Sequence, residues 1–309
     1  MMQDKLKAML LASFVGDSLA MPAHWIYDTD EIEHRFGRVE QLLAPPAQSY
    51  HAVRKMGEAT HYGDQMLLLL ESVAAFPGFD LEHFGRSWRE MFANYDGYFD
   101  NATKTTLKNF AEGRGVKDAG SSSADLAGAA RIGPLVYYYA DDLERLVEAC
   151  RLQTAMTHNN AMVIDAAEFF ARAAHKILHG ATPTSAFEAL IKGPPGSGPS
   201  LKQWVEEAMA VTGEKTRDVI GTFGRSCAAN GAFRSVVHIT LKYQDNLREA
   251  LIENVMAGGD SAARGLLIGM LLGAHCGMAA IPREWLANLA RYQRLLELMA
   301  EIDRSRNLH

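Results

Sequence analysis

The sequence predicts an all-α fold, organised as one compact domain over residues 1–309. Apolar residues recur at three- and four-residue steps in most windows, which is the spacing of one helix face. Patterns typical of strands are almost absent. Two mostly β-branched or aromatic runs, 136–139 and 236–240, lie inside longer helical windows, so we expect helices there as well. About ten or more helices are expected in total.

The helical windows follow one another along most of the chain. An apolar first helix is expected around residues 9–19, and the later windows are 64–76, 81–92, 102–112, 143–156, 158–179, 201–211, 245–256 and 283–303. The strongest of these is 158–179, where Val163, Ala166 and Phe170 belong to a regular apolar face. Gly180 supplies a natural end to that helix.

Two segments are predicted to be loops. Residues 39–59 contain adjacent prolines and little periodicity, and residues 192–199 read KGPPGSGP, which is too rich in proline and glycine for a regular element. Neither segment is flanked by a change in composition. We therefore expect one domain with two excursions rather than two domains.

The segment 265–281 is apolar except for His275 and has glycine at every fourth position: Gly265, Gly269, Gly273 and Gly277. A helix would place these glycines in one stripe, along which a neighbouring backbone can approach closely. At 17 residues the segment is shorter than a typical membrane span of about 20. It is predicted to be a buried central helix.

Composition bounds the class of protein. A hydrophobic fraction of 48% with 22% charged residues is ordinary for a globular chain, and the net charge of −6 offers no basic field for nucleic acid or an acidic membrane. Three cysteines do not make a disulfide framework and are typical of a reducing cytosol. The N-terminal apolar patch is too interrupted for a signal peptide. A cytoplasmic location is expected, and the oligomeric state stays open.

Three aspartates stand beside glycines within or next to apolar segments. Asp17 lies inside the first apolar helix, where it needs a hydrogen-bond partner. Asp64 and Asp260 each precede an apolar run, where a carboxylate either caps the helix or presents itself as a ligand. If these two junctions face each other, their oxygens would suit Mg²⁺. Both interpretations remain open on the residues alone.

A further polar group opens the strongest helix. Thr157 is a reasonable N-cap, and His158, Asn159 and Asn160 follow it. These three side chains would line a polar pocket. The histidines of the chain show no zinc-binding spacing, and the nucleophile-elbow, Walker and dinucleotide motifs are absent from the sequence.

Together these segments resemble the ADP-ribosylglycohydrolase family, which includes dinitrogenase-reductase-activating glycohydrolases and J1 crystallins. The resemblance runs over nearly the whole chain and is carried by GDSLAMPAHW, HYGDQ, GAARIGPL, THNN and GGDSAARGLLIGMLLGAHCGMAAIPREW. It implies an all-α domain of that type with a cleft holding two Mg²⁺ or Mn²⁺ ions. It also implies hydrolysis of an N- or O-glycosidic bond to ADP-ribose, in which metal ions polarise the ribose and orient a water.

The sequence departs from the family where metal should bind. The family usually has Thr-Asp-Asp-Thr at the motif occupied here by residues 62–65 (YGDQ), and Gly-Gly-Asp-Thr-Asp-Thr where residues 258–263 read GGDSAA. His24 stands where some members carry a substrate-handling Glu, and the phosphate loop before Arg131 has lost its Asn-Gly character. We therefore expect fewer than two Mg²⁺ or Mn²⁺ ions, or none.

Carried over residue by residue, the resemblance implies three sets of site residues. Asp64, Asp260 and His61 are the catalytic candidates, and Asp64, Asp260 and Ser261 are the metal candidates. The substrate-binding candidates are Asp17, His24, Tyr62, Gly128, Arg131, His158, Asn159 and Asn160.

The expected function is that of a divergent hydrolase cleaving a glycosidic bond to ADP-ribose or a related nucleoside-sugar. The alternative is a non-catalytic pseudo-enzyme that binds ADP-ribose or a nucleotide, and a third is a structural role like that of the lens crystallins. The expected partner is a small molecule or an ADP-ribosylated substrate, with no nucleic acid and no membrane.

Overall fold

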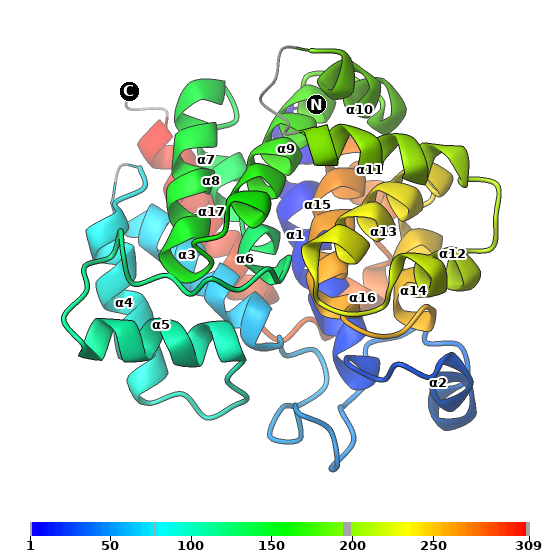
Figure 1. The fold of residues 1–309 in the computed structure, drawn as a ribbon, viewed down its shortest axis with the longest axis horizontal. Coiled ribbons are helices and arrows are strands. Elements are labelled where there is room, and N and C mark those ends of the chain that lie inside the picture. The colour runs from blue at the N-terminus through cyan, green and yellow to red at the C-terminus, as the bar shows by residue number, and fades with distance from the viewer. Residues whose placement is uncertain (1, 77, 194–198, 307–309) are drawn as a thin grey trace.

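The computed structural model describes residues 2–76, 78–193 and 199–306, and these fold into α-helices joined by loops, with two isolated β-bridges and no strand (Figure 1). The α-helices are α1 (Met2–Ala20), α2 (Thr29–Phe36), α3 (His61–Ala75), α4 (Leu81–Ala93), α5 (Asn101–Ala111), α6 (Ala127–Ala130), α7 (Gly133–Tyr138), α8 (Leu143–Thr157), α9 (Ala161–Leu178), α10 (Pro183–Lys192), α11 (Pro199–Ala210), α12 (Thr216–Phe223), α13 (Ala229–Lys242), α14 (Leu247–Met256), α15 (Ser261–Cys276), α16 (Arg283–Asn288) and α17 (Tyr292–Arg306). Two short 3₁₀ helices are η1 (Met21–Ala23) and η2 (Met278–Ala280).

The centre of the fold is the antiparallel pair α1 and α15, around which the other helices are arranged (Figure 1). A Cβ atom added to Gly265 would lie 2.4 Å from the carbonyl oxygen of Gly16, and one added to Gly269 would lie 2.1 Å from that of Ala12. Gly273 meets Ala8 in the same way, at 2.5 Å. The two backbones therefore touch directly, and the predicted glycine stripe and buried central helix are confirmed for these three glycines.

The fourth glycine of the stripe has another role. Gly277 has a φ of +74° and caps the C-terminus of α15, so the expectation of a helix continuing to residue 281 is wrong. A positive φ is easy for glycine and ends the helical path. The chain turns there into η2.

One segment, residues 2–23, is long and apolar enough to cross a membrane by length and composition alone. It comprises α1 and η1, and 94% of its most apolar window is buried inside the protein. Within the fold this segment is the partner of α15 and serves as a core helix.

Most predicted helices are found within a few residues of their expected bounds, including α4, α5, α8, α9 and α14. The helix expected over 283–303 is instead divided into α16 and α17. At the break the N–H of Ala290 donates to the carbonyl of Gly57 at 3.0 Å, so the long loop docks on the backbone between the two helices. A contact so distant in sequence leaves no trace in local periodicity.

The expected cap at Thr157 is wrong, and Asp64 does not cap a helix, which is one of the two roles that the sequence leaves open for it. Thr157 is the last residue of α8, and Asn160 caps α9 by accepting from the N–H of Met162. Asp64 lies in the first turn of α3, which is capped by Thr60. In both places the helix boundary lies three or four residues from the expected one, which changes the side chains that face inward.

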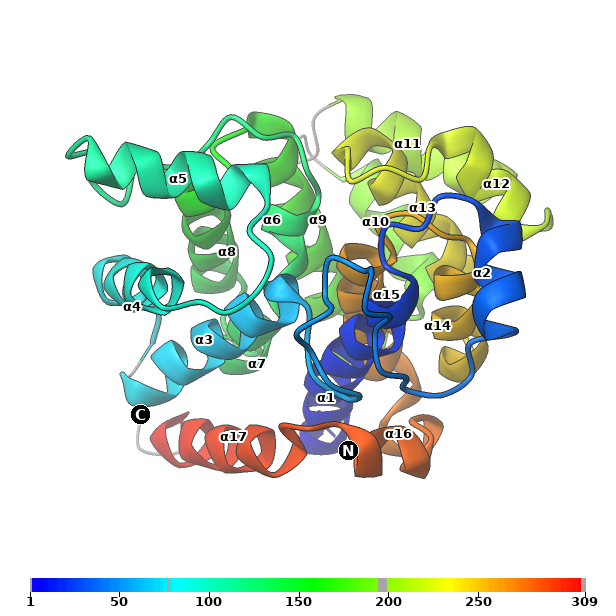
Figure 2. The same ribbon diagram turned by 90° about the horizontal axis from the view of Figure 1, so that it is seen from below.

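Residues 39–59 contain no helix or strand, as predicted, and the loop lies across the ends of α1 and α3 (Figure 2). Of the second predicted loop, Lys192 ends α10 and Pro199 begins α11, while residues 194–198 lie outside the described part of the chain. The position of the first loop therefore brings its residues close to the ends of α1 and α3.

Replacing Gly269 by alanine should destabilise the protein. The new methyl would lie 2.1 Å from the Ala12 carbonyl oxygen, so α1 and α15 must separate, and we expect the free energy of unfolding to fall by about 3 kcal/mol despite the better helix propensity of alanine. Urea denaturation measures this. Gly213→Ala is the matched control, because no atom lies within 4 Å of its added Cβ. Equal stability of the two variants would contradict direct backbone contact.

His238 should make stability depend on pH. It is buried on α13, its two ring nitrogens have no hydrogen-bond partner among the described residues, and burial lowers its pKa from 6.5 to about 4. The unfolded chain therefore binds the proton more tightly, so stability is full above pH 6.5 and falls as the pH drops toward 4. We expect His238→Met to remove about 3 kcal/mol of that fall. Denaturation at pH 7 and pH 4.5 tests this, with exposed His34→Gln as the control that should change nothing.

Candidate functional site

The site is built where the C-terminal end of α1 meets the N-terminal end of α15. The N–H of Trp25 donates to the carbonyl of Gly259 at 2.9 Å, and the N–H of Gly259 donates to the carbonyl of Ile26 at 2.7 Å. Gly258 and Gly259 both have positive φ, which allows this tight turn. As a result the His24 Nε2 atom lies 2.8 Å from the Asp260 Oδ1 atom, and both side chains are buried.

A second histidine extends this contact. The His24 Nδ1 atom lies 2.7 Å from the Nε2 atom of His51, which comes from the 39–59 loop. Because the Asp260 carboxylate accepts from Nε2, a neutral His24 accepts at Nδ1 and His51 donates from its Nε2. This arrangement leaves the His51 Nδ1 without a proton.

A second histidine–aspartate pair lies next to the row formed by Asp260, His24 and His51. His61 opens α3, and its Nε2 lies 3.3 Å from the Oδ2 of Asp100, which also caps α5 by accepting from the N–H of Thr103. The imidazole of His61 stacks with those of His24 and His51, at centroid distances of 6.5 and 6.1 Å. We call His24, His51, His61, Asp100 and Asp260 the histidine–aspartate cluster.

Burial sets the charge of the cluster. It lowers the pKa of His24 against the opposing effect of Asp260, and burial together with the neighbouring histidines lowers the pKa of His51 to about 2. Burial alone would raise the pKa of Asp100, but its hydrogen bonds to His61 and to the N–H of Thr103, together with the nearby histidines, outweigh this and lower it. At neutral pH the cluster therefore combines neutral His24 and His51 with an ionised Asp100.

Arg131 and His158 form another buried chain, behind Gly128. The Arg131 guanidinium donates to Gln65 and to the hydroxyl of Thr157, whose oxygen lies 2.9 Å from the His158 Nδ1. Burial lowers the pKa of Arg131 to about 10 and, with the Arg131 charge, that of His158 to about 3. The two terminal nitrogens of the guanidinium donate to residues of α3 and α8, so Arg131 joins these helices, whereas its Nε has no partner among the described residues.

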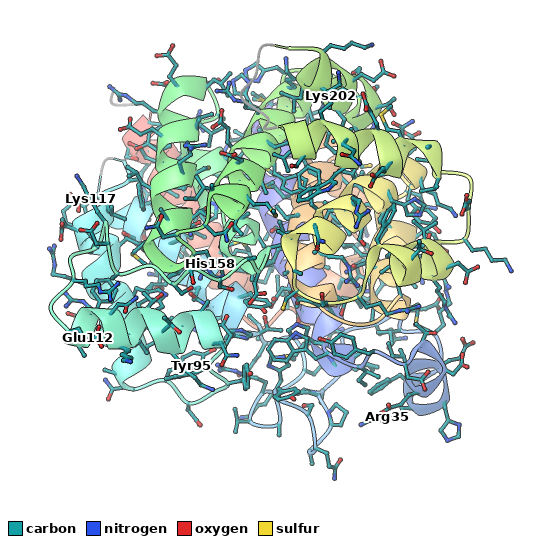
Figure 3. All side chains as sticks on the ribbon, in the orientation of Figure 1. Arg35, Tyr95, Glu112, Lys117, His158 and Lys202 are labelled. Atoms are coloured by element: carbon teal, nitrogen blue, oxygen red, sulfur yellow. The ribbon has the colours of Figure 1, made fainter. Side chains whose placement is uncertain are left out.

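Gly128 is required by this packing, because an added Cβ would lie 2.5 Å from the His158 ring. Figure 3 labels His158 near the middle of the molecule, at the junction of α8 and α9. Asn159 follows it and is exposed, and Asn160 is half-buried and caps α9.

Asp17 holds the start of α3. Its two carboxylate oxygens accept from the backbone N–H and the hydroxyl of Thr60, at 2.7 and 2.6 Å. Burial raises its pKa to about 7, against the lowering effect of those hydrogen bonds. Since Thr60 is the N-cap of α3, Asp17 fixes where that helix begins.

Asp64 is engaged away from the cluster. Its Oδ2 accepts from Arg54 and from the hydroxyl of Tyr95, each at 2.7 Å, and the guanidinium lies over the Tyr95 ring. These residues line a surface pocket of about 310 Å³ together with Arg291. Each helical residue turns the chain by about 100°, so with α3 beginning at His61 it is His61 and Tyr62 that face His24.

Buried polar atoms of the site lack partners. Within the described part of the chain, no hydrogen bond reaches the Asp260 Oδ2, the Ser261 hydroxyl, the His61 Nδ1 or the His158 Nε2. A buried polar atom left without a partner costs about 1–3 kcal/mol. Such atoms are usually satisfied by water or by a ligand.

Three aromatic rings cover the cluster. Trp25, Tyr50 and Tyr98 contact one another at centroid distances of 4.9 to 5.0 Å, and Trp25 stacks on His24 at 4.1 Å. Trp25 has a φ of +67°, a strained value for a side-chain-bearing residue. Tyr50 is 58% exposed, so the outer part of this aromatic group lies in solvent.

The family model of ADP-ribosylglycohydrolase matches residues 1–308. The chain belongs to the ADP-ribosylglycohydrolase family. Crystallin J1B of Tripedalia cystophora is 25% identical over 98% of this chain and 97% of its own length, and an uncharacterised protein of Archaeoglobus fulgidus is 24% identical over 97% and 96%. A solved ADP-ribosylglycohydrolase-related protein complex has the same fold, with a TM-score of 0.77 and 23% identity over 99% of each chain.

The residues of this chain do not fit the binuclear metal centre that the resemblance to ADP-ribosylglycohydrolases implies. Among the described residues no group of three or more His, Cys, Asp or Glu side chains is placed to hold a metal ion. Of the expected ligands Asp64, Asp260 and Ser261, the Asp64 carboxylate is engaged by Arg54 and Tyr95. One oxygen of Asp260 is likewise held by His24.

In this family member the structure brings together His24, His61, Tyr62 and Asp260 from the expected site, and places Asp17, Gly128 and Arg131 in supporting positions. Sequence reasoning missed His51, Asp100 and Trp25. Asp100 carried one usable signal, as an aspartate two residues before the predicted helix 102–112, and Trp25 stood in a quoted motif. His51 lies in a loop without periodicity and carried none.

Replacing Asp64 by asparagine should loosen the 39–59 loop. The change removes the charge that holds the partly buried Arg54, and we expect a loss of about 1–2 kcal/mol of stability and faster proteolysis within the loop. Limited proteolysis and urea denaturation measure these effects. Glu31→Gln is the control, because its pair with Arg35 is exposed and should contribute less than about 0.5 kcal/mol. Two variants with the same behaviour would show that the Arg54–Asp64 pair does not hold the loop.

Proposed function

We propose that this ADP-ribosylglycohydrolase homologue hydrolyses a glycosidic bond to the ribose of ADP-ribose or of a related nucleoside-sugar, using the histidine–aspartate cluster. Family membership supports the reaction class. The observation that carries the proposal is Asp260, a buried carboxylate with one oxygen fixed by His24 and the other without a partner among the described residues.

The free oxygen of Asp260 is suited to a ribose. A ribose hydroxyl or a water would satisfy it, offsetting the cost of burying it alone. As the bond to the leaving group breaks, positive charge develops on the sugar ring. A carboxylate already held in place by His24 stabilises that charge without reorganising during the reaction.

The histidines of the cluster orient this carboxylate and a water. His24 bridges Asp260 to His51, whose unprotonated Nδ1 accepts a hydrogen bond from the attacking water. With a pKa of about 2, His51 is a weak base. It therefore positions the water while the charge on the sugar makes the carbon reactive, as expected for an oxocarbenium-like transition state. His61 holds Asp100 in the same way, as a second carboxylate beside the site.

In this proposal the reaction does not use a pair of metal ions, because the carboxylates that would bind them, Asp64 and one oxygen of Asp260, are held by protein side chains. A single Mg²⁺ or Mn²⁺ ion stays a prediction, as do the cytoplasmic location and the lack of nucleic-acid and membrane partners.

A non-catalytic binder of ADP-ribose is the second candidate function. The aromatic rings over the cluster favour it, since such rings can stack on a nucleoside and bind it without any reaction.

Asp260→Asn should lower kcat by at least about a hundredfold, because the amide cannot stabilise the developing positive charge. The assay follows release of the free sugar from ADP-ribosyl-arginine, ADP-ribosyl-serine and simple ribosides, each with EDTA and with Mg²⁺. Turnover should persist in EDTA. Glu206→Gln on the exposed face of α11 is the control, and thermal unfolding confirms that each variant is folded.

Two results would overturn the proposal. Turnover lost in EDTA and restored by Mg²⁺ would contradict catalysis by the cluster alone. Tight binding of ADP-ribose in calorimetry with no turnover of any substrate would establish the non-catalytic binder instead.

A further inference from the structure

We propose that the C-terminal turn of α9 binds a divalent transition-metal ion of the Zn²⁺ class through the imidazoles of His175 and His179. This site lies outside the histidine–aspartate cluster and is independent of the proposed function. Four features of the structure support it: the distance between the two rings, the hydrogen bond of His179, the charge state of His175 and the position of the pair at a helix end.

His175 and His179 are one helical turn apart, which makes their side chains neighbours on one face of α9. Their ring centroids lie 4.2 Å apart, and the ring planes are inclined by 27°. Two nitrogens bound to one tetrahedral Zn²⁺ ion at about 2.05 Å would lie about 3.3 Å from each other. Rings at the observed separation can reach that spacing by rotation about their side-chain bonds, without movement of the helix.

The hydrogen bond of His179 prepares one of its nitrogens for a metal ion. Its Nδ1 lies 2.8 Å from the carbonyl oxygen of His175. Because a carbonyl oxygen can only accept, Nδ1 carries the proton and Nε2 is left unprotonated. Metal-bound histidines usually donate their second ring nitrogen to a carbonyl or a carboxylate in this way, which fixes the ring and raises its basicity.

His175 is also in the form that binds metal. Burial, followed by the effect of His179, lowers the pKa of His175 from its ordinary value, so its imidazole is neutral at pH 7. A metal ion binds the deprotonated imidazole, and at this pH it has no proton to displace. His175 is half-buried and His179 is exposed, so an ion reaches the pair directly from solvent.

Three charged side chains act on His175. The carboxylate of Asp141 favours a cation there, whereas Lys176 and Arg172 oppose one. The Arg172 guanidinium is paired with Glu168 at 2.9 Å, which offsets much of its charge. The nearby side chains therefore leave a small net effect on a bound ion.

The position of the pair at a helix end adds to the attraction. His179 is the C-cap of α9, and the carbonyl groups of a last helical turn carry partial negative charge that stabilises cations. Imidazole nitrogens suit Zn²⁺, Cu²⁺ and Ni²⁺ rather than Mg²⁺. Among the described residues no third His, Cys, Asp or Glu joins the pair, so water completes the coordination.

Sequence reasoning missed this pair. The segment 175–179 reads HKILH and lacks the glutamate that completes the zinc-binding HExxH motif. The two histidines alone therefore predict metal binding without the peptidase chemistry of that motif.

Calorimetric titration of the full chain with Zn²⁺, after removal of metal with EDTA, tests the proposal. His175→Gln and His179→Gln should each raise the Kd at least about tenfold, because each removes one of two protein ligands. His34→Gln is the matched control, since it removes an exposed histidine from α2, and it should leave the Kd unchanged. Excess Mg²⁺ should not compete with Zn²⁺. Circular dichroism confirms that each variant is folded.

A second measurement identifies the ligands. Cu²⁺ added at one equivalent should show two imidazole nitrogens in its electron paramagnetic resonance spectrum, and one or none in either variant.

Three results would overturn the proposal. The first is the absence of Zn²⁺ binding tighter than about 1 mM. The second is equal affinity of the wild type and both glutamine variants. The third is binding that is weakened by Mg²⁺ or by Asp260→Asn, which would place the ion at the histidine–aspartate cluster instead. None of these results bears on whether the cluster hydrolyses a glycosidic bond, which the turnover assays decide.

Discussion

The direct contact between the backbones of α1 and α15 is the constraint on which the rest of the structure depends. Because glycines at 265, 269 and 273 admit the carbonyl groups of Gly16, Ala12 and Ala8, the two helices lie antiparallel at the closest approach that backbones allow. The end of α1 is thereby brought to the start of α15. His24 and Asp260, far apart in sequence, become neighbours as a consequence of this packing.

A buried hydrogen bond from one end of α1 then sets the rotation of α3. Asp17 accepts from Thr60, Thr60 caps α3, and the helix begins at His61. Because α3 begins at His61, its rotation about its own axis places His61 and Tyr62 on the side of the cluster and Asp64 on the side of Arg54. A shift of helix start by a few residues thus decides which side chains are available for chemistry, and it is decided by a tertiary contact.

The polar network of the site is built mostly from neutral groups and carboxylates. Burial keeps His24 and His51 uncharged, and hydrogen bonds from histidines fix the carboxylates of Asp260 and Asp100. Several buried polar atoms have no partner among the described residues, and water or a ligand would satisfy them. In this chain the Asp64 carboxylate and one oxygen of Asp260 are held by protein side chains, and the second oxygen of Asp260 has no partner among the described residues.

The sequence by itself determined the helical class, the glycine stripe and several members of the site, because periodicity and local motifs reflect interactions between residues near in the chain. It also indicated that the metal motifs are degenerate, through residues 62–65 and 258–263. Only the tertiary structure decided that Asp64 pairs with Arg54 and that His51 joins His24. Both depend on contacts between different elements of the fold, and no local pattern encodes the rotation of a helix or the position at which a loop docks.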